Sequence, residues 1–96
     1  MKKQTGDYQY YKCELDHAIV IALDSWPETR LRKNIQSAMF DLCHYEDLRI
    51  ENDPAWVPDD ESSSLKRFAM KLLDMHEKPT NEIMHEFLTL EERYTR

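Results

Sequence analysis

Apolar side chains recur at steps of three and four residues along most of this chain, and this spacing limits what the chain can fold into. Residues three and four apart lie on one face of an α-helix, whereas a half-buried strand alternates residue by residue. We expect an amphipathic helix over residues 7–24. Its apolar positions are Tyr11, Leu15, Ala18, Ile19, Ala22 and Leu23. The Tyr-rich start at 8–11 could instead form a strand, but no partner strand is evident later, so helix is favoured.

A second helix is predicted to follow almost at once and to run to about Ile50. Ser25 and Glu28 have the spacing of a capping box, and Pro27 suits the first helical turn, whose amides lack partners within the helix. With a length of roughly 24 residues and roughly 36 Å, this helix is expected to be the central spine of the fold. Its apolar positions are Leu31, Ile35, Ala38, Met39, Leu42, Tyr45 and Leu48.

Pro54 and Pro58 interrupt the helical pattern and predict the main loop over residues 52–59, because proline lacks an amide donor and disfavours helical angles in the preceding residue. After it, Asp59, Asp60 or one of the serines at 62–64 can cap a third helix of roughly 17 residues. Its expected buried face is Leu65, Phe68, Ala69, Leu72, Leu73 and His76.

A fourth helix of roughly 14 residues is predicted after Lys78 and Pro79 end the third, with Thr80 as its cap. Its expected buried side is Ile83, Met84, Phe87, Leu88, Leu90 and Tyr94. The chain of 96 residues is therefore predicted to be one all-α domain, a small bundle of about four helices with residues 1–6 as a flexible tail. Four methionines are expected to fill the core: Met39, Met70, Met75 and Met84.

Composition excludes several classes of protein. The single glycine, Gly6, excludes the glycine-rich loops of P-loop and dinucleotide-binding proteins, so no nucleotide cofactor is expected. The longest apolar run, 18–23, is far shorter than the roughly 20 residues of a membrane span. No cleavage site of a secretion signal follows the N-terminal lysines. Cys13 and Cys43 make no disulfide scaffold, and we expect a reducing cytoplasm.

Negative charge is concentrated between Asp41 and Glu61. This segment holds eight acids and one base, Arg49, for a balance of −7, whereas the whole chain carries −6, which leaves +1 for the remainder. Such a segment would attract a basic partner and speed encounter at low salt. The structural alternative is a solvated helix end followed by acids that favour the start of the third helix. The sequence leaves both interpretations open.

Trp56 lies between two prolines and among these acids, so it is predicted either to anchor a partner or to fold back between the second and third helices. On the first interpretation, the loop and its neighbours form a docking surface. The predicted partner-binding residues are Glu46, Asp47, Glu51, Asp53, Trp56, Val57, Asp59, Asp60 and Glu61.

Basic residues near the start of the second helix are unfavourable for its dipole, which suggests a second candidate surface. Together with bases on the third helix they could contact phosphates as a nucleic-acid face. That face would consist of Arg30, Arg32, Lys33, Lys66, Arg67 and Lys71. The simpler interpretation is that these bases pair with Glu28 or with the acidic segment.

A zinc site from Cys13, His17, Cys43 and His44 can be drawn, but adjacent residues on a helix point roughly 100° apart and no Cys-x-x-Cys pair is present. We therefore expect buried structural cysteines and no metal. No nucleophile stands beside a base in a recognisable motif, so no enzyme is predicted.

The sequence thus favours a small acidic protein that docks on the basic surface of a larger protein, such as a nuclease or another nucleic-acid enzyme, and modulates or inhibits it. A short, acidic, cofactor-free helical domain is typical of accessory and anti-host proteins of phages and mobile elements, although this is analogy from composition alone. The alternative is a helical DNA-binding regulator that uses the basic face.

Overall fold

The computed structural model describes residues 3–25, 29–75 and 80–94, and these ranges contain four helices and no strand. They are α1 (Lys3–Asp24), α2 (Thr29–Asn52), α3 (Asp60–Asp74) and α4 (Asn81–Tyr94). The predicted all-α class is confirmed, and the Tyr-rich start is helical, as expected.

The helix ends differ from the prediction in two places. α1 begins at Lys3, so residues 3–6, expected as a flexible tail, belong to the helix. α3 ends at Asp74, and Met75 follows in an extended conformation while its amide still bonds to the carbonyl of Leu72 at 3.1 Å. The proposed capping box of Ser25 and Glu28 falls largely on residues outside the described ranges, as do His76, Lys78 and Pro79.

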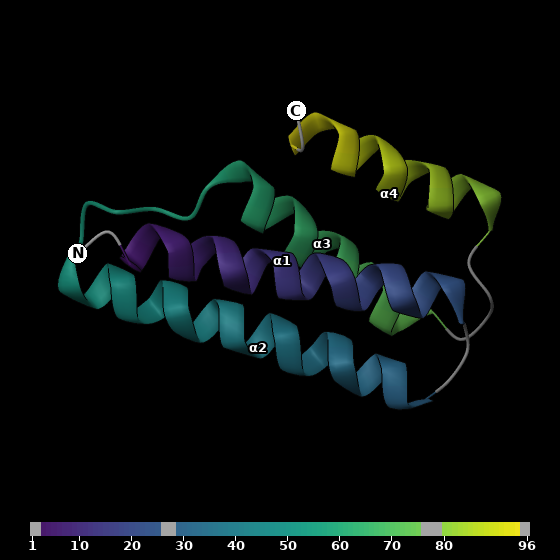
Figure 1. Cartoon of the computed structure of the whole chain (residues 1–96), viewed down its shortest axis with the longest axis horizontal. Coiled ribbons are helices and arrows are strands. Elements are labelled where there is room, and N and C mark those ends of the chain that lie inside the picture. The colour runs from purple at the N-terminus through teal and green to yellow at the C-terminus, as the bar shows by residue number, and fades with distance from the viewer. Residues whose placement is uncertain (1–2, 26–28, 76–79, 95–96) are drawn as a thin grey trace.

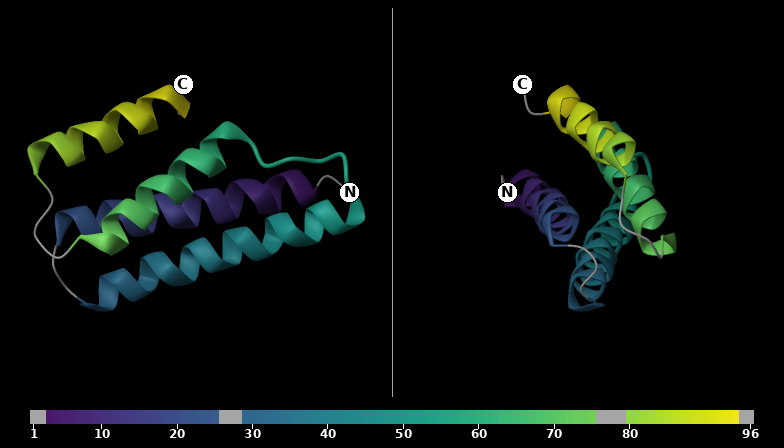
Figure 2. Two further views of the ribbon diagram at one scale, coloured as in Figure 1. Left: turned by 180° about the vertical axis from the view of Figure 1, so that it is seen from behind. Right: turned by 90° about the vertical axis from the view of Figure 1, so that its right-hand side faces the viewer.

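The helices form a flattened bundle of 41 × 28 × 18 Å. α1 and α2 run antiparallel along their length, α3 packs across both of them, and α4 lies on the far side of α3 from α2 (Figures 1 and 2). α2 has 24 residues, as predicted, and forms its most extensive contact with α1, while α3 packs against α1, α2 and α4.

The core follows the predicted helical faces closely. Leu15, Ile19, Ile35, Leu42 and Leu72 are fully buried between α1, α2 and α3. Among the α4 side chains whose burial the structure describes, residues 81–93, the buried one is that of Phe87, whose ring stacks on that of Phe68 with 5.2 Å between centroids.

Three residues predicted to lie on apolar helix faces are exposed instead. Leu88 is 58% exposed, Met70 is 56% exposed and Leu48 is 46% exposed. Leu88 and Met70 each follow a buried residue, Phe87 or Ala69, and a step of one residue turns the side chain roughly 100° around the helix, away from the face that is covered.

The loop between α2 and α3 has a defined backbone. The amide of Trp56 donates to the carbonyl of Asp53 at 2.8 Å, and the Asp53 carboxylate accepts from the Ala55 amide at 3.3 Å. Asp at the first position and Pro54 at the second are the residues that such a turn prefers. The turn brings the loop back along the bundle end at which α1 begins (Figure 1).

Candidate functional site

The acidic segment divides into carboxylates that point inward and carboxylates that point to solvent. Glu46 of α2 is only 2% exposed. Its carboxylate accepts hydrogen bonds from the hydroxyl of Tyr8 at 2.8 Å, from the hydroxyl of Ser62 and from the ammonium of Lys66. Because these donors come from α1 and α3, Glu46 joins three helices and is closed to a partner, which removes it from the predicted docking surface.

Asp59 begins α3 and also ties the loop to α1. Its carboxylate accepts from the Ser62 amide at 2.8 Å, which makes it the N-cap, and from the Lys12 ammonium at 2.7 Å. Lys12 also lies 3.2 Å from a carboxylate oxygen of Glu61. The Asp59 amide donates to the Tyr8 hydroxyl at 3.2 Å. Asp59 and Glu61 are thus engaged within the chain, and of the caps that the sequence allowed (Asp59, Asp60 or a serine at 62–64), Asp59 is the one that forms the capping bond.

The pKa values of this network follow from burial and pairing. Burial raises the pKa of Tyr8 well above its ordinary value, so its hydroxyl stays protonated. Burial alone would lower the pKa of Lys12, but its hydrogen bonds to Asp59 and Glu61 outweigh this, and the pKa is raised. Burial likewise opposes ionisation of Asp59, yet the Lys12 ammonium and the Ser62 amide leave the pKa of that carboxyl below its ordinary value.

Trp56 is half-buried and packs against the core instead of projecting into solvent. Its ring meets the edge of Tyr8 at a centroid distance of 5.3 Å, and the guanidinium carbon of Arg49 lies 5.2 Å from its centroid. The one base of the acidic segment thus covers the indole, and this arrangement favours the plug interpretation over the anchor.

The outward part of the segment forms what we call the acidic end: Asp47, Glu51, Asp53, Val57 and Asp60. All five side chains are exposed, and Val57 is 71% exposed. They come from the last turns of α2, the loop that follows and the start of α3, which lie in the same half of the bundle (Figure 1). None of the four carboxylates forms an ion pair with a residue that the structure describes.

The six bases of the alternative nucleic-acid face do not form one free surface. Arg32 donates to the backbone carbonyls of Met75, at 2.7 Å, and Leu73, and so satisfies the C-terminus of α3. Lys66 pairs with Glu46, as the simpler interpretation predicted for a base near the acidic segment. Lys71 pairs with Glu86. The other three bases, Arg30, Lys33 and Arg67, are exposed on α2 and α3.

The prediction that both cysteines are buried is wrong. Cys13 is exposed and Cys43 is half-buried, and burial raises the pKa of the Cys43 thiol. Both are free thiols. Within the described ranges, no three histidine, cysteine or carboxylate side chains gather closely enough to hold a metal ion.

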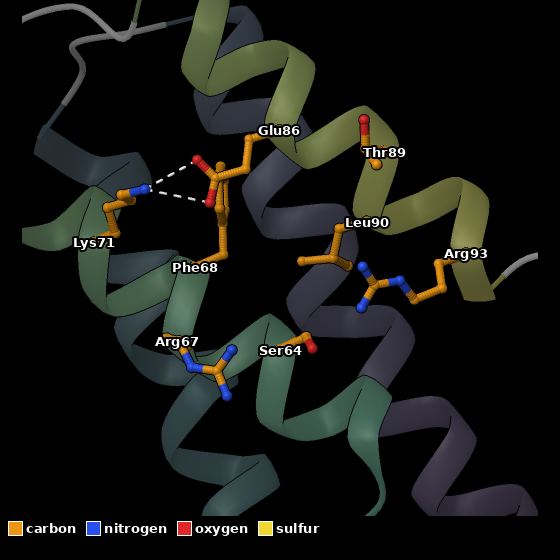
Figure 3. A pocket seen from close by; sticks show the side chains of 8 residues that line it. All are labelled: Ser64, Arg67, Phe68, Lys71, Glu86, Thr89, Leu90 and Arg93. Atoms are coloured by element: carbon orange, nitrogen blue, oxygen red, sulfur yellow. Dashed lines mark hydrogen bonds and ion pairs between the residues drawn. The ribbon is translucent and has the colours of Figure 1, made fainter.

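The structure contains a groove between α3 and α4 that the sequence did not predict. It has a volume of about 410 Å³ and is lined by Ser64, Arg67, Phe68, Lys71, Glu86, Thr89, Leu90 and Arg93 (Figure 3). Arg67 and Lys71 are four residues apart and therefore share a helical face, which was the available signal. The sequence alone could not predict that Arg93 faces Arg67 and Lys71, because this depends on α4 packing beside α3.

Two carboxyl groups meet where α4 passes α1. Burial, together with the hydrogen bond to Glu91 and the negative charge of that residue, raises the pKa of Asp16 to about 7. The contact therefore holds a proton in the folded protein near neutral pH.

Comparison with protein-family models, with curated proteins and with solved structures gave no match to this chain. None of its described helices combines the length and apolar character needed to cross a membrane.

Proposed function

We propose that this chain is a protein-binding module that docks its acidic end on the basic surface of a larger protein and modulates or inhibits that protein. The single observation that carries the proposal is the acidic end itself, in which four exposed carboxylates that form no ion pair with any described residue accompany the exposed side chain of Val57. Charges of this kind steer encounter, and an apolar side chain among them adds contact area that leaves water on binding.

The internal network supports the proposal by holding the acidic end in one shape. Tyr8, Lys12 and Arg49 fix the loop through Asp59 and Trp56, so the loop loses little conformational entropy when a partner binds. Trp56, which the sequence offered as the anchor, packs against the core under the loop. Val57 therefore replaces it as the apolar residue that would contact a partner.

A nucleic-acid enzyme such as a nuclease is the partner class that fits this chemistry. Its substrate groove is basic because it receives phosphates, and a row of carboxylates can occupy the same groove. The proposal includes a cytoplasmic setting, which rests on the two free thiols and the absence of a disulfide between them. A phage or mobile-element origin remains an analogy from composition.

The test is an affinity capture from host lysate, with the captured proteins identified by mass spectrometry. The double variant Asp47→Lys with Glu51→Lys reverses two carboxylates of the acidic end. Glu14→Lys with Glu92→Lys makes the same change of net charge at exposed sites elsewhere. We expect the wild type and the control pair to retain a common basic partner, the acidic-end variant to lose it, and salt near about 1 M to release it.

Equal recovery of that partner by the acidic-end variant and the wild type would overturn the proposal. A gel shift at low salt tests the alternative directly, because the docking proposal expects no duplex binding by the isolated chain.

A further inference from the structure

We propose that the groove between α3 and α4 binds a small ligand that carries an oxyanion, either a carboxylate or a phosphate, on an apolar body about the size of an aromatic ring. The groove lies on other residues than the acidic end, so the two proposals can fail independently.

The charge of the groove is opposite to that of the whole chain. Three bases, Arg67, Lys71 and Arg93, line it together with one acid, Glu86, although the chain carries a net charge of −6. The two guanidinium groups come from different helices and point toward the middle of the groove from its two sides (Figure 3). Guanidinium groups bind carboxylate and phosphate oxygens through paired, charge-assisted hydrogen bonds, which makes an oxyanion the matching ligand group.

Charge is available in the groove for such a ligand. Arg67 is exposed and forms no ion pair with any residue in the described ranges. Lys71 does pair with Glu86 at 2.9 Å, but the two side chains are 47% and 49% exposed. A pair this exposed contributes little stability, so a ligand oxyanion can compete for the ammonium. The Thr89 hydroxyl already donates to the His85 carbonyl and is not counted as a donor.

The size and the apolar part of the groove indicate the rest of the ligand. Phe68, which is held in place by its stack on Phe87, and Leu90 line the groove between the charged groups. Its volume of about 410 Å³ lies within the range of roughly 300 to 1,000 Å³ that is usual for small-molecule sites. An inorganic ion alone would leave this apolar part uncovered, and a ligand with both parts would cover it.

The test uses four probes on the full chain. Phenyl phosphate and phenylacetate carry both parts of the ligand and distinguish a phosphate source from a carboxylate source. Inorganic phosphate carries the charge alone, and phenol carries the ring alone. Binding is followed by amide shifts in two-dimensional NMR and by the melting temperature, which rises when a ligand binds only the folded state.

We expect at least one aromatic anion to shift amides at 64–71 and 86–93 and to raise the melting temperature. Inorganic phosphate should bind at least about tenfold more weakly, and phenol should not bind measurably. Whichever of the two aromatic anions binds more tightly identifies the source. Failure of both, or binding of phenol or inorganic phosphate as tight as that of the aromatic anions, would overturn the proposal.

Variants tie the binding to the groove. Arg67→Glu should weaken the aromatic anion at least about tenfold, and Arg67→Gln, a milder change, should weaken it in the same direction. Lys33→Glu makes the same charge change as Arg67→Glu at an exposed site on α2 and should bind like the wild type. Circular dichroism confirms folding of each variant. Unchanged binding by folded Arg67→Gln, or an equal loss in Lys33→Glu, would contradict the assignment.

Discussion

Among single residues, Glu46 is the one on which the acidic end depends most. Its carboxylate is buried and accepts from Tyr8, Ser62 and Lys66, so it satisfies donors from two other helices at once. A buried group in such a network is costly to remove, because its partners lose their hydrogen bonds and stay buried.

We predict that Glu46→Ala lowers the free energy of unfolding by about 3 kcal/mol, because the Lys66 ammonium and two hydroxyls lose their acceptor. Urea unfolding followed by circular dichroism measures this change. Glu51→Ala, an exposed acid on the same helix, is the control and should change stability by less than about 0.5 kcal/mol. Equal urea midpoints for the two variants would show that the network does not stabilise the fold.

Asp16 gives a pH-dependent prediction. Its pKa is raised to about 7 in the folded chain, chiefly by burial and then by Glu91, whereas an unfolded aspartate ionises near about pH 4. Between these values the folded state holds a proton that the unfolded state has lost, so the contribution of Asp16 to stability declines as pH rises from about 4 to about 7.

Asp16→Asn removes the titrating group and should melt at a higher temperature than the wild type at about pH 8, with the difference shrinking toward about pH 4. Thermal melts across this range measure it. The exposed Asp24→Asn serves as control and should follow the wild type throughout. A difference between Asp16→Asn and the wild type that does not change with pH would exclude this explanation.

At the scale of single helices, α3 depends on contacts at both of its ends. Asp59 caps its start and binds Lys12 of α1, while Arg32 of α2 satisfies carbonyls at its finish. Since α3 packs against the other three helices, these end contacts also set the position of the groove and of the acidic end.

We predict that Asp59→Ala lowers the free energy of unfolding at neutral pH by about 2 kcal/mol, through loss of the cap and of the Lys12 pair. The pKa of Asp59 is lowered in the folded state, so its contribution is present above about pH 4 and is lost as pH falls further. Urea unfolding should therefore show a smaller difference in the free energy of unfolding between Asp59→Ala and the wild type at about pH 3 than at about pH 7. Asp60→Ala, an acid in the first turn without the capping bond, should cost less.

The sequence was sufficient to predict the positions of the helices, but not the side chains that form hydrogen bonds between helices. Apolar spacing located all four helices. Local chemistry offered Asp59 as one of several possible caps and identified Thr80, whose hydroxyl accepts from the Ile83 amide at 3.3 Å. The burial of Glu46 could not be foreseen, because its donor Tyr8 is 38 residues away and carboxylates are expected at the surface.

The misplaced residues on α3 and α4 have a related cause. Leu88 and Met70 are apolar residues that continue a plausible helical face, and only the neighbours of each helix decide which side is covered. α4 has α3 as its main neighbour and therefore buries a narrow stripe. The same missing information about neighbours concealed the α3/α4 groove.

At the scale of the whole molecule, α1, α2 and α3 form an extensively packed unit, and α4 packs against it with a smaller buried surface. Of the side chains that the structure describes as buried, nearly all belong to α1, α2 and α3, whereas α4 contributes Phe87 over residues 81–93. α4 is held by the stack of Phe87 on Phe68 and by the contacts of Glu86 and Glu91 with Lys71 and Asp16.

We predict that α4 opens before the rest of the fold, because few buried apolar contacts oppose its release. Hydrogen–deuterium exchange with mass spectrometry should show peptides of α4 exchanging faster than peptides covering 31–50 and 62–72. Phe87→Ala should speed exchange in α4 with a much smaller effect in α2. Uniform exchange of all four helices would show instead that the chain unfolds as one unit.

The path of the loop places the first turns of α1 next to the acidic end, because Tyr8 contacts both Trp56 and Asp59. A tag, label or domain attached at the first turns of α1 would therefore compete with a partner for space near this loop, so a negative binding result from such a fusion would reflect crowding as readily as a lack of affinity.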